Sequence, residues 1–231
     1  MAGYLRGEGL LRMLSKLVIL LVAVFVSTDI VQAREAVTPS GATVEYSHDP
    51  VALIVSYALN IGELAEPGGG PKMQIYGDGL AVIHYPDYMT RAGNFELQLS
   101  SEEMAALLSS LVTHGVLAFD ATSARASMRE TATLRQNDSG IMHYVSDPST
   151  TVIEMHIVRY QTPGKVSAQS INPDSTIRWS GLQTDARQYP DHVAIQGLAA
   201  AEQTLRTLME RPDMVKSAAG SHATTVTPGS N

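Results

Sequence analysis

Two histidines and a glutamate are the first residues in this sequence whose types and spacing could do chemistry. His143, Glu154 and His156 fall in the two arms, 141–145 and 151–160, of a predicted hairpin. In that hairpin, Glu154 and His156 share one face of the strand, and His143 lies roughly opposite Glu154 or the residue before it. Two imidazoles and a carboxylate on one face could hold zinc. The alternative interpretation is a solvated polar face whose intervening apolar residues face a core.

A second group of residues could line a binding pocket. Arg178, Trp179, Asp185 and Tyr189 bring a cation, two aromatic rings and a carboxylate into one short segment. Such a mixture suits a sugar-like or aromatic ligand. The alternative is core packing, because Ile177 and Trp179 lie on the same face of a predicted strand.

Familiar catalytic motifs are missing from the sequence. It contains no G-x-S-x-G nucleophile elbow, no H-E-x-x-H, no G-x-x-x-x-G-K phosphate loop and no G-x-G-x-x-G. The glycine run at 68–70 is followed by Pro71, which is typical of a flexible loop. Glu102 and Glu103 suit the start of a helix, where acidic side chains are favoured. We therefore expect no bound cofactor and no catalytic activity.

Composition narrows the range of partners. The 231-residue chain has a formal net charge of −7, and removal of a leader of net charge +1 leaves −8. This balance argues against general nucleic-acid binding, which needs a basic surface. The chain has no cysteine, which excludes disulfides, thiol catalysis and a lipid-modified N-terminal cysteine.

The first 33 residues have the pattern of a secretory signal peptide. A basic start is followed by an apolar run at 17–26 and by a small-x-small cleavage site at 31–33. The run has ten residues, whereas a membrane-spanning helix needs about 20. We expect cleavage after Ala33 and a periplasmic or secreted mature protein with no membrane attachment. The alternative is an uncleaved N-terminal anchor.

The elements that must position the candidate side chains include a hairpin at 72–85. Its apolar residues alternate on both sides of Gly77-Asp78-Gly79, and the turn could close on either dipeptide. Both choices place the same four residues on the core face, namely Met73, Ile75, Leu80 and Val82.

Two amphipathic helices are expected to cover the sheet. The first spans 101–114, begins with a Ser100–Glu103 capping box and ends at Gly115. The second runs from about 191 to 210, and the intervening segment 121–136 is compatible with a weaker helix. The apolar stripe of the second helix consists of Ile195, Leu198, Ala201, Leu205 and Leu208. Further short strands are expected at 43–46, 51–59 and 95–99, near Val166, and at 177–179.

These elements predict an α+β fold in which a hairpin-built antiparallel sheet packs against two amphipathic helices. The predicted organisation is a signal peptide at 1–33, a lead-in at 34–42, a single α+β domain at 43–212 and a disordered tail at 213–231.

The hairpin and the first helix contain two short motifs. Tyr76, Gly77, Asp78 and Gly79 form a Y-G-D-G hairpin, and an L-S-x-E-E helix start follows with Leu99, Ser100, Glu102 and Glu103. In this pattern the chain resembles a group of uncharacterised exported bacterial proteins. The resemblance covers about residues 51 to 120 and implies a bacterial, exported protein. It brings no catalytic residue to this chain.

The sequence as a whole favours a non-enzymatic domain that binds a protein or another component of the cell envelope. This hypothesis rests mainly on the missing catalytic motifs. The alternative is an envelope hydrolase or metal-assisted enzyme that uses His143, Glu154 and His156.

Overall fold

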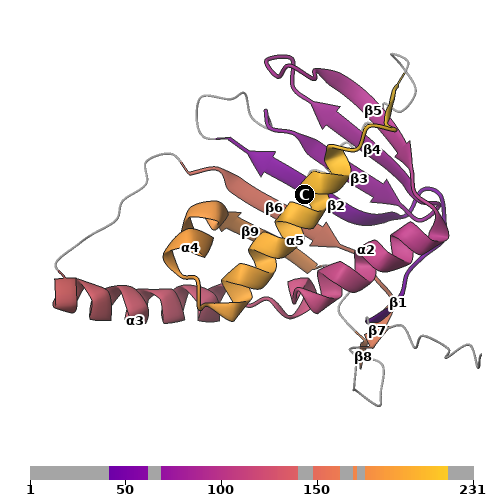
Figure 1. Ribbon diagram of the computed structural model, residues 1–231. Coiled ribbons are helices and arrows are strands. Elements are labelled where there is room, and N and C mark those ends of the chain that lie inside the picture. Colours follow the sequence, from indigo (N-terminus) through magenta and orange to yellow (C-terminus); the bar gives the residue numbers. More distant parts are fainter. Residues whose placement is uncertain (1–41, 62–68, 140–147, 162–168, 171–174, 218–231) are drawn as a thin grey trace, which may run out of the picture. The chain divides into compact units, whose positions relative to one another are not determined.

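A seven-stranded antiparallel sheet forms the centre of the fold (Figure 1). The computed structural model describes residues 42–61, 69–139, 148–161, 169–170 and 175–217, all of which belong to one unit at 39–231. The strand order is β10-β5-β4-β3-β2-β6-β9. In chain order these strands are β2 (Leu53–Asn60), β3 (Lys72–Tyr76), β4 (Leu80–Tyr85), β5 (Gly93–Gln98), β6 (Thr150–Met155), β9 (Ser175–Ser180) and β10 (Val215–Lys216).

A smaller sheet has the order β1-β7-β8 and is also antiparallel. Its strands are β1 (Thr43–Glu45), β7 (Arg159–Gln161) and β8 (Gln169–Ser170). The strand predicted at 43–46 is therefore present, but it pairs with β7 rather than with the main sheet. The strand predicted near Val166 lies outside the described residues.

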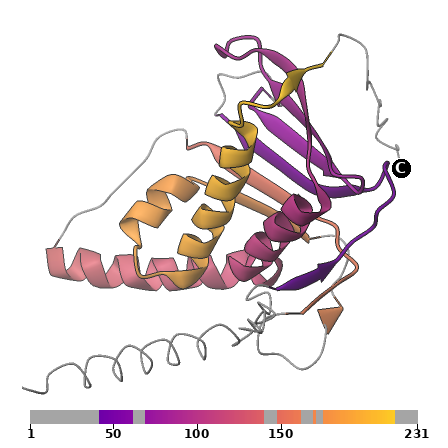
Figure 2. The same cartoon turned by 45° about the vertical axis from the view of Figure 1, so that its right-hand side comes forward.

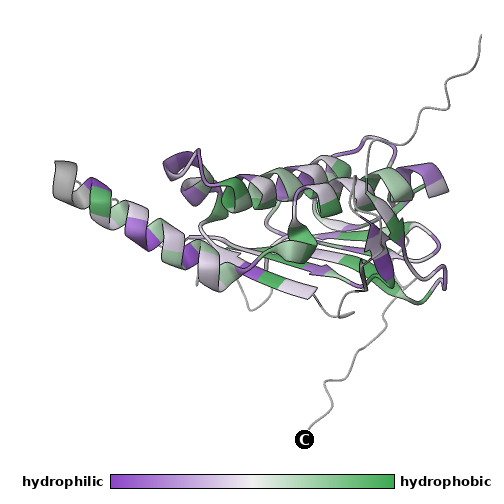
Figure 3. Cartoon of the chain, turned by 90° about the horizontal axis from the view of Figure 1, so that it is seen from below, coloured by the Kyte–Doolittle hydropathy of each residue, from purple (hydrophilic) through white to green (hydrophobic). Residues whose placement is uncertain are grey.

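The helices lie together on one side of the main sheet (Figure 3). They are α2 (Ser101–Thr113), the short 3₁₀ turn η1 (Val116–Ala118), α3 (Ala121–Ser139), α4 (Leu182–Gln188) and α5 (Val193–Met209). The apolar stripes of α2 and α5 and the inner face of the sheet form one buried core. The predicted α+β class is confirmed, with two amphipathic helices on an antiparallel sheet. This packing is the usual way for such a sheet to bury one face.

The ends of α2 follow from local chemistry as predicted. The Ser100 hydroxyl accepts from the Glu103 backbone N–H at 3.2 Å, and the Glu103 carboxylate accepts from the Ser100 N–H at 2.8 Å. Gly115 follows the helix with a φ of 80°, a conformation that costs a side-chain-bearing residue more than glycine.

The predicted faces of the β3–β4 hairpin are wrong on one arm. Three residues, 77–79, connect the strands. Met73 therefore pairs with Ile83, and not with Val82 or His84 on either side of it in β4. Gly79 makes the extra residue possible because its φ is 84°. A shift of one residue reverses every side chain of a strand. Consequently Ala81 and Ile83 are fully buried, whereas the expected core residues Leu80 and Val82 are only half-buried.

The predicted boundary at residue 212 is too early. Val215 and Lys216 form β10, which pairs with β5 at the edge of the sheet, and Met214 is 8% exposed. The Ser217 hydroxyl donates to the Glu96 carboxylate at 2.6 Å. Residues 213–217 therefore belong to the domain, and 218–231 lie outside the described residues.

The helix α3 is longer than predicted and is only partly embedded. It continues to Ser139, past the expected end at 136. Ala124 and Met128 are buried, and Leu134 on the second half is 61% exposed. Figures 1 and 2 show this second half extending beyond the sheet. The thin apolar stripe explains why the buried apolar residues of α3 lie in its first half.

Candidate functional site

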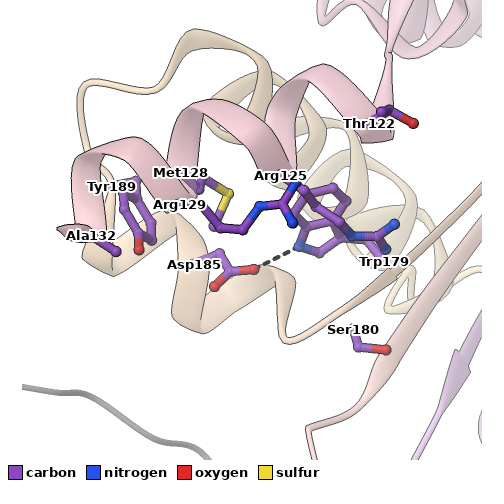
Figure 4. Close-up of a pocket in the computed structure, with 9 residues that line it drawn as sticks. All are labelled: Thr122, Arg125, Met128, Arg129, Ala132, Trp179, Ser180, Asp185 and Tyr189. Atoms are coloured by element: carbon purple, nitrogen blue, oxygen red, sulfur yellow. Dashed lines mark hydrogen bonds between the residues drawn. The ribbon is translucent and has the colours of Figure 1, made fainter.

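A groove between α3 and α4 brings together three of the four residues predicted to line a pocket. Trp179, Asp185 and Tyr189 all border this groove, which has a volume of about 530 Å³ (Figure 4). Arg178 does not, because successive residues of a strand point to opposite faces. Arg178 is exposed, whereas its neighbour Trp179 is 2% exposed and belongs to the core. Its inclusion in the predicted pocket was therefore wrong.

The connection between β9 and α4 places Asp185 beside the indole of Trp179. Gly181 follows the strand with a φ of 76°, and its carbonyl accepts from the backbone N–H of Thr184 and of Asp185. The first turn of α4 therefore begins directly at the end of β9. The Trp179 indole N–H donates to Asp185 Oδ2 at 2.7 Å, which fixes the carboxylate at the floor of the groove.

Burial raises the pKa of Asp185 above its usual value. The indole hydrogen bond and the positive charge of Arg125 both act in the opposite direction, but desolvation is the largest of the three effects. Asp185 is therefore a carboxyl group that gains a proton more readily than an exposed aspartate does.

One face of α3 forms the opposite wall of the groove. Residues at helical spacing supply it, namely Thr122, Arg125, Met128, Arg129 and Ala132. Figure 4 shows Arg125, Met128 and Arg129 on the side of α3 that faces Trp179 and Asp185. The wall thus combines a buried thioether with two exposed guanidinium groups.

Arginine–aromatic contacts hold α3 against the rest of the domain. The guanidinium of Arg125 lies 4.7 Å from the centre of the Trp179 ring, and that of Arg135 lies 5.2 Å from the Tyr189 ring. Arg135 also donates to the carbonyl of Gln188 at 2.6 Å. The Phe119 ring meets Trp179 edge-on at 5.5 Å. The indole is therefore covered by protein groups and offers no free ring face to a ligand.

A buried glutamate anchors α4 from beneath. Glu202 of α5 is 0% exposed, and its carboxylate accepts from the Tyr57 hydroxyl at 3.1 Å and from the Gln183 amide at 2.6 Å. Burial, together with the neighbouring Glu202, raises the pKa of Tyr57 far above its usual range, so this phenol stays protonated. These bonds connect β2, α5 and α4, and so help to position Asp185.

The strand pairing of β6 rules out the hairpin on which the predicted metal site depended. The strand β6 lies between β2 and β9, and Glu154 pairs with Ser56 on one side and with Thr176 on the other. Both edges of β6 are therefore occupied, and the predicted hairpin between 141–145 and 151–160 is wrong for this strand. His156 follows the strand, and its N–H donates to Ile54.

His143 itself lies outside the described residues. Among the residues that the structure does describe, no three His, Asp or Glu side chains come close enough together to hold a metal ion.

The glycines of the Y-G-D-G segment are explained by close packing. A Cβ on Gly77 would lie 2.3 Å from the Ser47 carbonyl oxygen, and one on Gly79 would lie 2.4 Å from the Leu99 carbonyl oxygen. Both positions therefore require glycine for the hairpin to pack against its neighbours. The motif serves the fold and supplies no chemical group to the α3–α4 groove.

Sequence reasoning missed the arginines of α3 and the buried Glu202. The arginines occur in a weakly amphipathic segment, and the spacing of Arg125 and Arg129 by four residues was the available signal. Glu202 interrupts an otherwise apolar stripe, and a charged residue at such a position indicates a buried partner.

No protein-family model matches this chain, and no curated protein is significantly similar to it. Across the described ranges no single helix is long and apolar enough to cross a membrane. The two helical segments Ser101–Ala118 and Ala121–Arg135 meet the same length and composition test when they are taken together, with a bend of 71° between them.

Proposed function

We propose that this chain is an exported, non-enzymatic binding protein of the cell envelope, and that the α3–α4 groove holds its ligand. The observation that carries the proposal is the groove itself. Two cationic side chains face a carboxylate that the Trp179 indole already holds in place. Polar groups that are fixed before a ligand arrives lower the entropic cost of binding it.

Binding fits the groove better than catalysis does. Asp185 is the one carboxylate among its described lining residues, and one of its oxygens already accepts a hydrogen bond. Acid–base hydrolysis of glycosides uses two carboxyl groups, and nucleophilic catalysis uses a nucleophile beside a base. The lining residues provide neither pair. The metal-assisted alternative depended on a hairpin that β6 does not form, so no observation favours it.

Export rests on the leader pattern at 1–33 and on the resemblance to exported bacterial proteins. Expression with the native leader, followed by intact-mass measurement of the exported fraction, tests it. We expect the measured mass to equal that of a chain that begins at Arg34. An uncleaved chain retained in the membrane fraction would contradict this part of the proposal.

The single tryptophan of the chain provides a direct test of binding. Trp179 is the sole indole in the sequence and lies at the groove, so its fluorescence responds to a ligand there. The test adds a protein-free, low-molecular-weight extract of the cell envelope to the mature protein. We expect a saturable change in emission that Arg129→Ala weakens.

Arg178→Ala is the matched control, because it removes the same charge from the exposed position beside Trp179. An extract that leaves the wild-type emission unchanged would refute the proposed function of the groove. An equal loss of the response in both variants would refute it too, because the effect would then depend on overall charge.

A further inference from the structure

The charge of the groove is opposite to that of the chain. The sequence carries a net charge of −7, yet Arg125 and Arg129 both face the groove from adjacent turns of α3. Like charges four residues apart destabilise a helix. Neither guanidinium forms a salt bridge with a carboxylate within the described part of the chain. An anion placed between them and the floor of the groove would remove this repulsion.

Arginine is suited to a particular kind of anion. Its planar guanidinium binds a carboxylate or a phosphate through two parallel hydrogen bonds. The stacking of Arg125 on Trp179 holds that side chain in one orientation. Arg129 is exposed, and its guanidinium has no hydrogen-bond partner among the described residues, so its donors are available to a ligand.

The other groups at the groove call for donors on the ligand. Asp185 Oδ2 accepts from the indole, and its second oxygen has no hydrogen bond among the described residues. Hydroxyl groups of Thr122, Ser180 and Tyr189 also line the groove. A ligand hydroxyl can donate to the free oxygen of Asp185 and exchange hydrogen bonds with the protein hydroxyls.

An apolar or purely aromatic ligand fits less well. Arg125 and Phe119 cover the Trp179 ring, so the groove offers no free indole face on which an aromatic group could stack. Its volume of about 530 Å³ is within the range of about 300–1,000 Å³ that small-molecule sites occupy.

We infer that the groove binds a small acidic sugar, whose carboxylate or phosphate lies at Arg125 and Arg129 and whose hydroxyl donates to Asp185. This inference rests on the proposed function, because it names the class of ligand for the same groove. Carboxylate and phosphate share the chemistry that the guanidinium groups recognise, and the experiment distinguishes them.

Three sugars with a common ring test the inference. The mature protein is titrated with glucose, glucuronate and glucose 6-phosphate, and binding is followed by Trp179 fluorescence and by calorimetry. We expect at least one acidic sugar to bind tenfold or more tightly than glucose. The tighter of the two identifies the anionic group.

Variants localise the interaction. Arg129→Ala is expected to weaken the acidic sugar tenfold or more while leaving glucose unchanged. Arg129→Lys keeps the charge but loses the paired donors, and we expect it to recover only part of that loss. Arg178→Ala removes an equal charge outside the groove and is expected to have no effect. Arg129 and Arg178 are both exposed, so each variant is expected to fold.

The inference is overturned if glucose binds as tightly as both acidic sugars, or if Arg178→Ala weakens binding as much as Arg129→Ala. It is also overturned if no sugar binds while the envelope extract still changes the emission. In that case the ligand class is wrong and the proposed binding function stands. If neither the sugars nor the extract produces a response, the proposed function itself fails.

Discussion

Replacing Tyr57 by phenylalanine tests whether the buried hydrogen bonds to Glu202 hold the helices on the sheet. The substitution removes one oxygen atom and retains the ring, so it leaves no large cavity beneath α5. It deletes the 3.1 Å hydrogen bond to Glu202 but leaves the bond from Gln183 in place. The change therefore isolates a single buried contact with a carboxylate.

The expected magnitude follows from the environment of that contact. A hydrogen bond to a charged group contributes about 1.5–3 kcal/mol, and removal of one partner leaves the buried Glu202 with fewer donors. We expect Tyr57→Phe to lower the free energy of unfolding by about 2 kcal/mol. For a domain of this size, the melting temperature would fall by about 4–8 °C.

The pH dependence provides a second readout. The pKa of Tyr57 in the folded protein is raised above its usual value of 10.0, so the stability that this group contributes is complete below pH 10.0. That contribution decreases as the pH rises above 10.0, because the unfolded phenol ionises while the buried one keeps its proton. The wild type should therefore lose stability in alkali more steeply than Tyr57→Phe.

Equilibrium unfolding in urea, followed by Trp179 fluorescence at neutral and alkaline pH, measures both effects. Tyr46→Phe is the control, because Tyr46 is half-buried and its hydroxyl has no hydrogen bond among the described residues. A loss at neutral pH no larger than that of the control would refute the assigned role of Tyr57. An unchanged slope in alkali would show that the phenol is not protected by burial.

Three further predictions concern the groove, the turns and the last strand. Asp185→Asn keeps an acceptor for the indole N–H. Because the pKa of Asp185 is raised, ionisation of this group destabilises the wild type, so the melting temperature of the variant should rise relative to that of the wild type between about pH 3.5 and 7. An equal difference in melting temperature at both pH values would contradict this. Gly115→Ala should lower the free energy of unfolding in urea by approximately 1–2 kcal/mol, and Gly79→Ala should lower it by more. Both glycines have a positive φ, but only at Gly79 would a Cβ meet backbone atoms. Equal losses would show that the close backbone contact at Gly79 adds nothing to the cost. A chain that ends at residue 212 lacks the buried Met214 and should lose about 1.5–3 kcal/mol of stability. A chain that ends at residue 217 retains β10 and should keep that stability. Equal melting temperatures of the two chains would contradict the role of the strand.

Local signals allowed much of the fold to be predicted. The capping box at Ser100 and the positive φ at Gly115 depend on residues close together in sequence, and the structure confirms them. The apolar stripe of α5 is a local signal of the same kind and is confirmed except at Leu208, which is only half-buried. The hairpin faces were harder to predict, because a connection of two residues and one of three differ only at Gly79. A single residue then decides which side chains enter the core.

The candidate site depended on pairings that sequence patterns do not reveal. Trp179 and Asp185 are close along the chain, so their association was predictable. Arg125 comes from a distant helix, and its contact with Trp179 exists only after α3 has packed. The metal hypothesis assumed that β6 pairs with the segment just before it, whereas Glu154 pairs with Ser56, which is far earlier in the chain.

The position of β6 has a consequence for the order in which the chain can fold. Val55 of β2 pairs with Met155 of β6, and closing so long a loop carries a larger entropic cost than closing a local hairpin. Strands β2 to β5 can pair as successive hairpins while the chain is still incomplete, but one edge of β2 stays open until residue 155 is available. The core also needs β9 and α5, which come later still. Completion of the native fold must therefore wait for the carboxyl-terminal third of the chain. For the export proposed above this delay is useful, because the native core cannot form before α5 has been made.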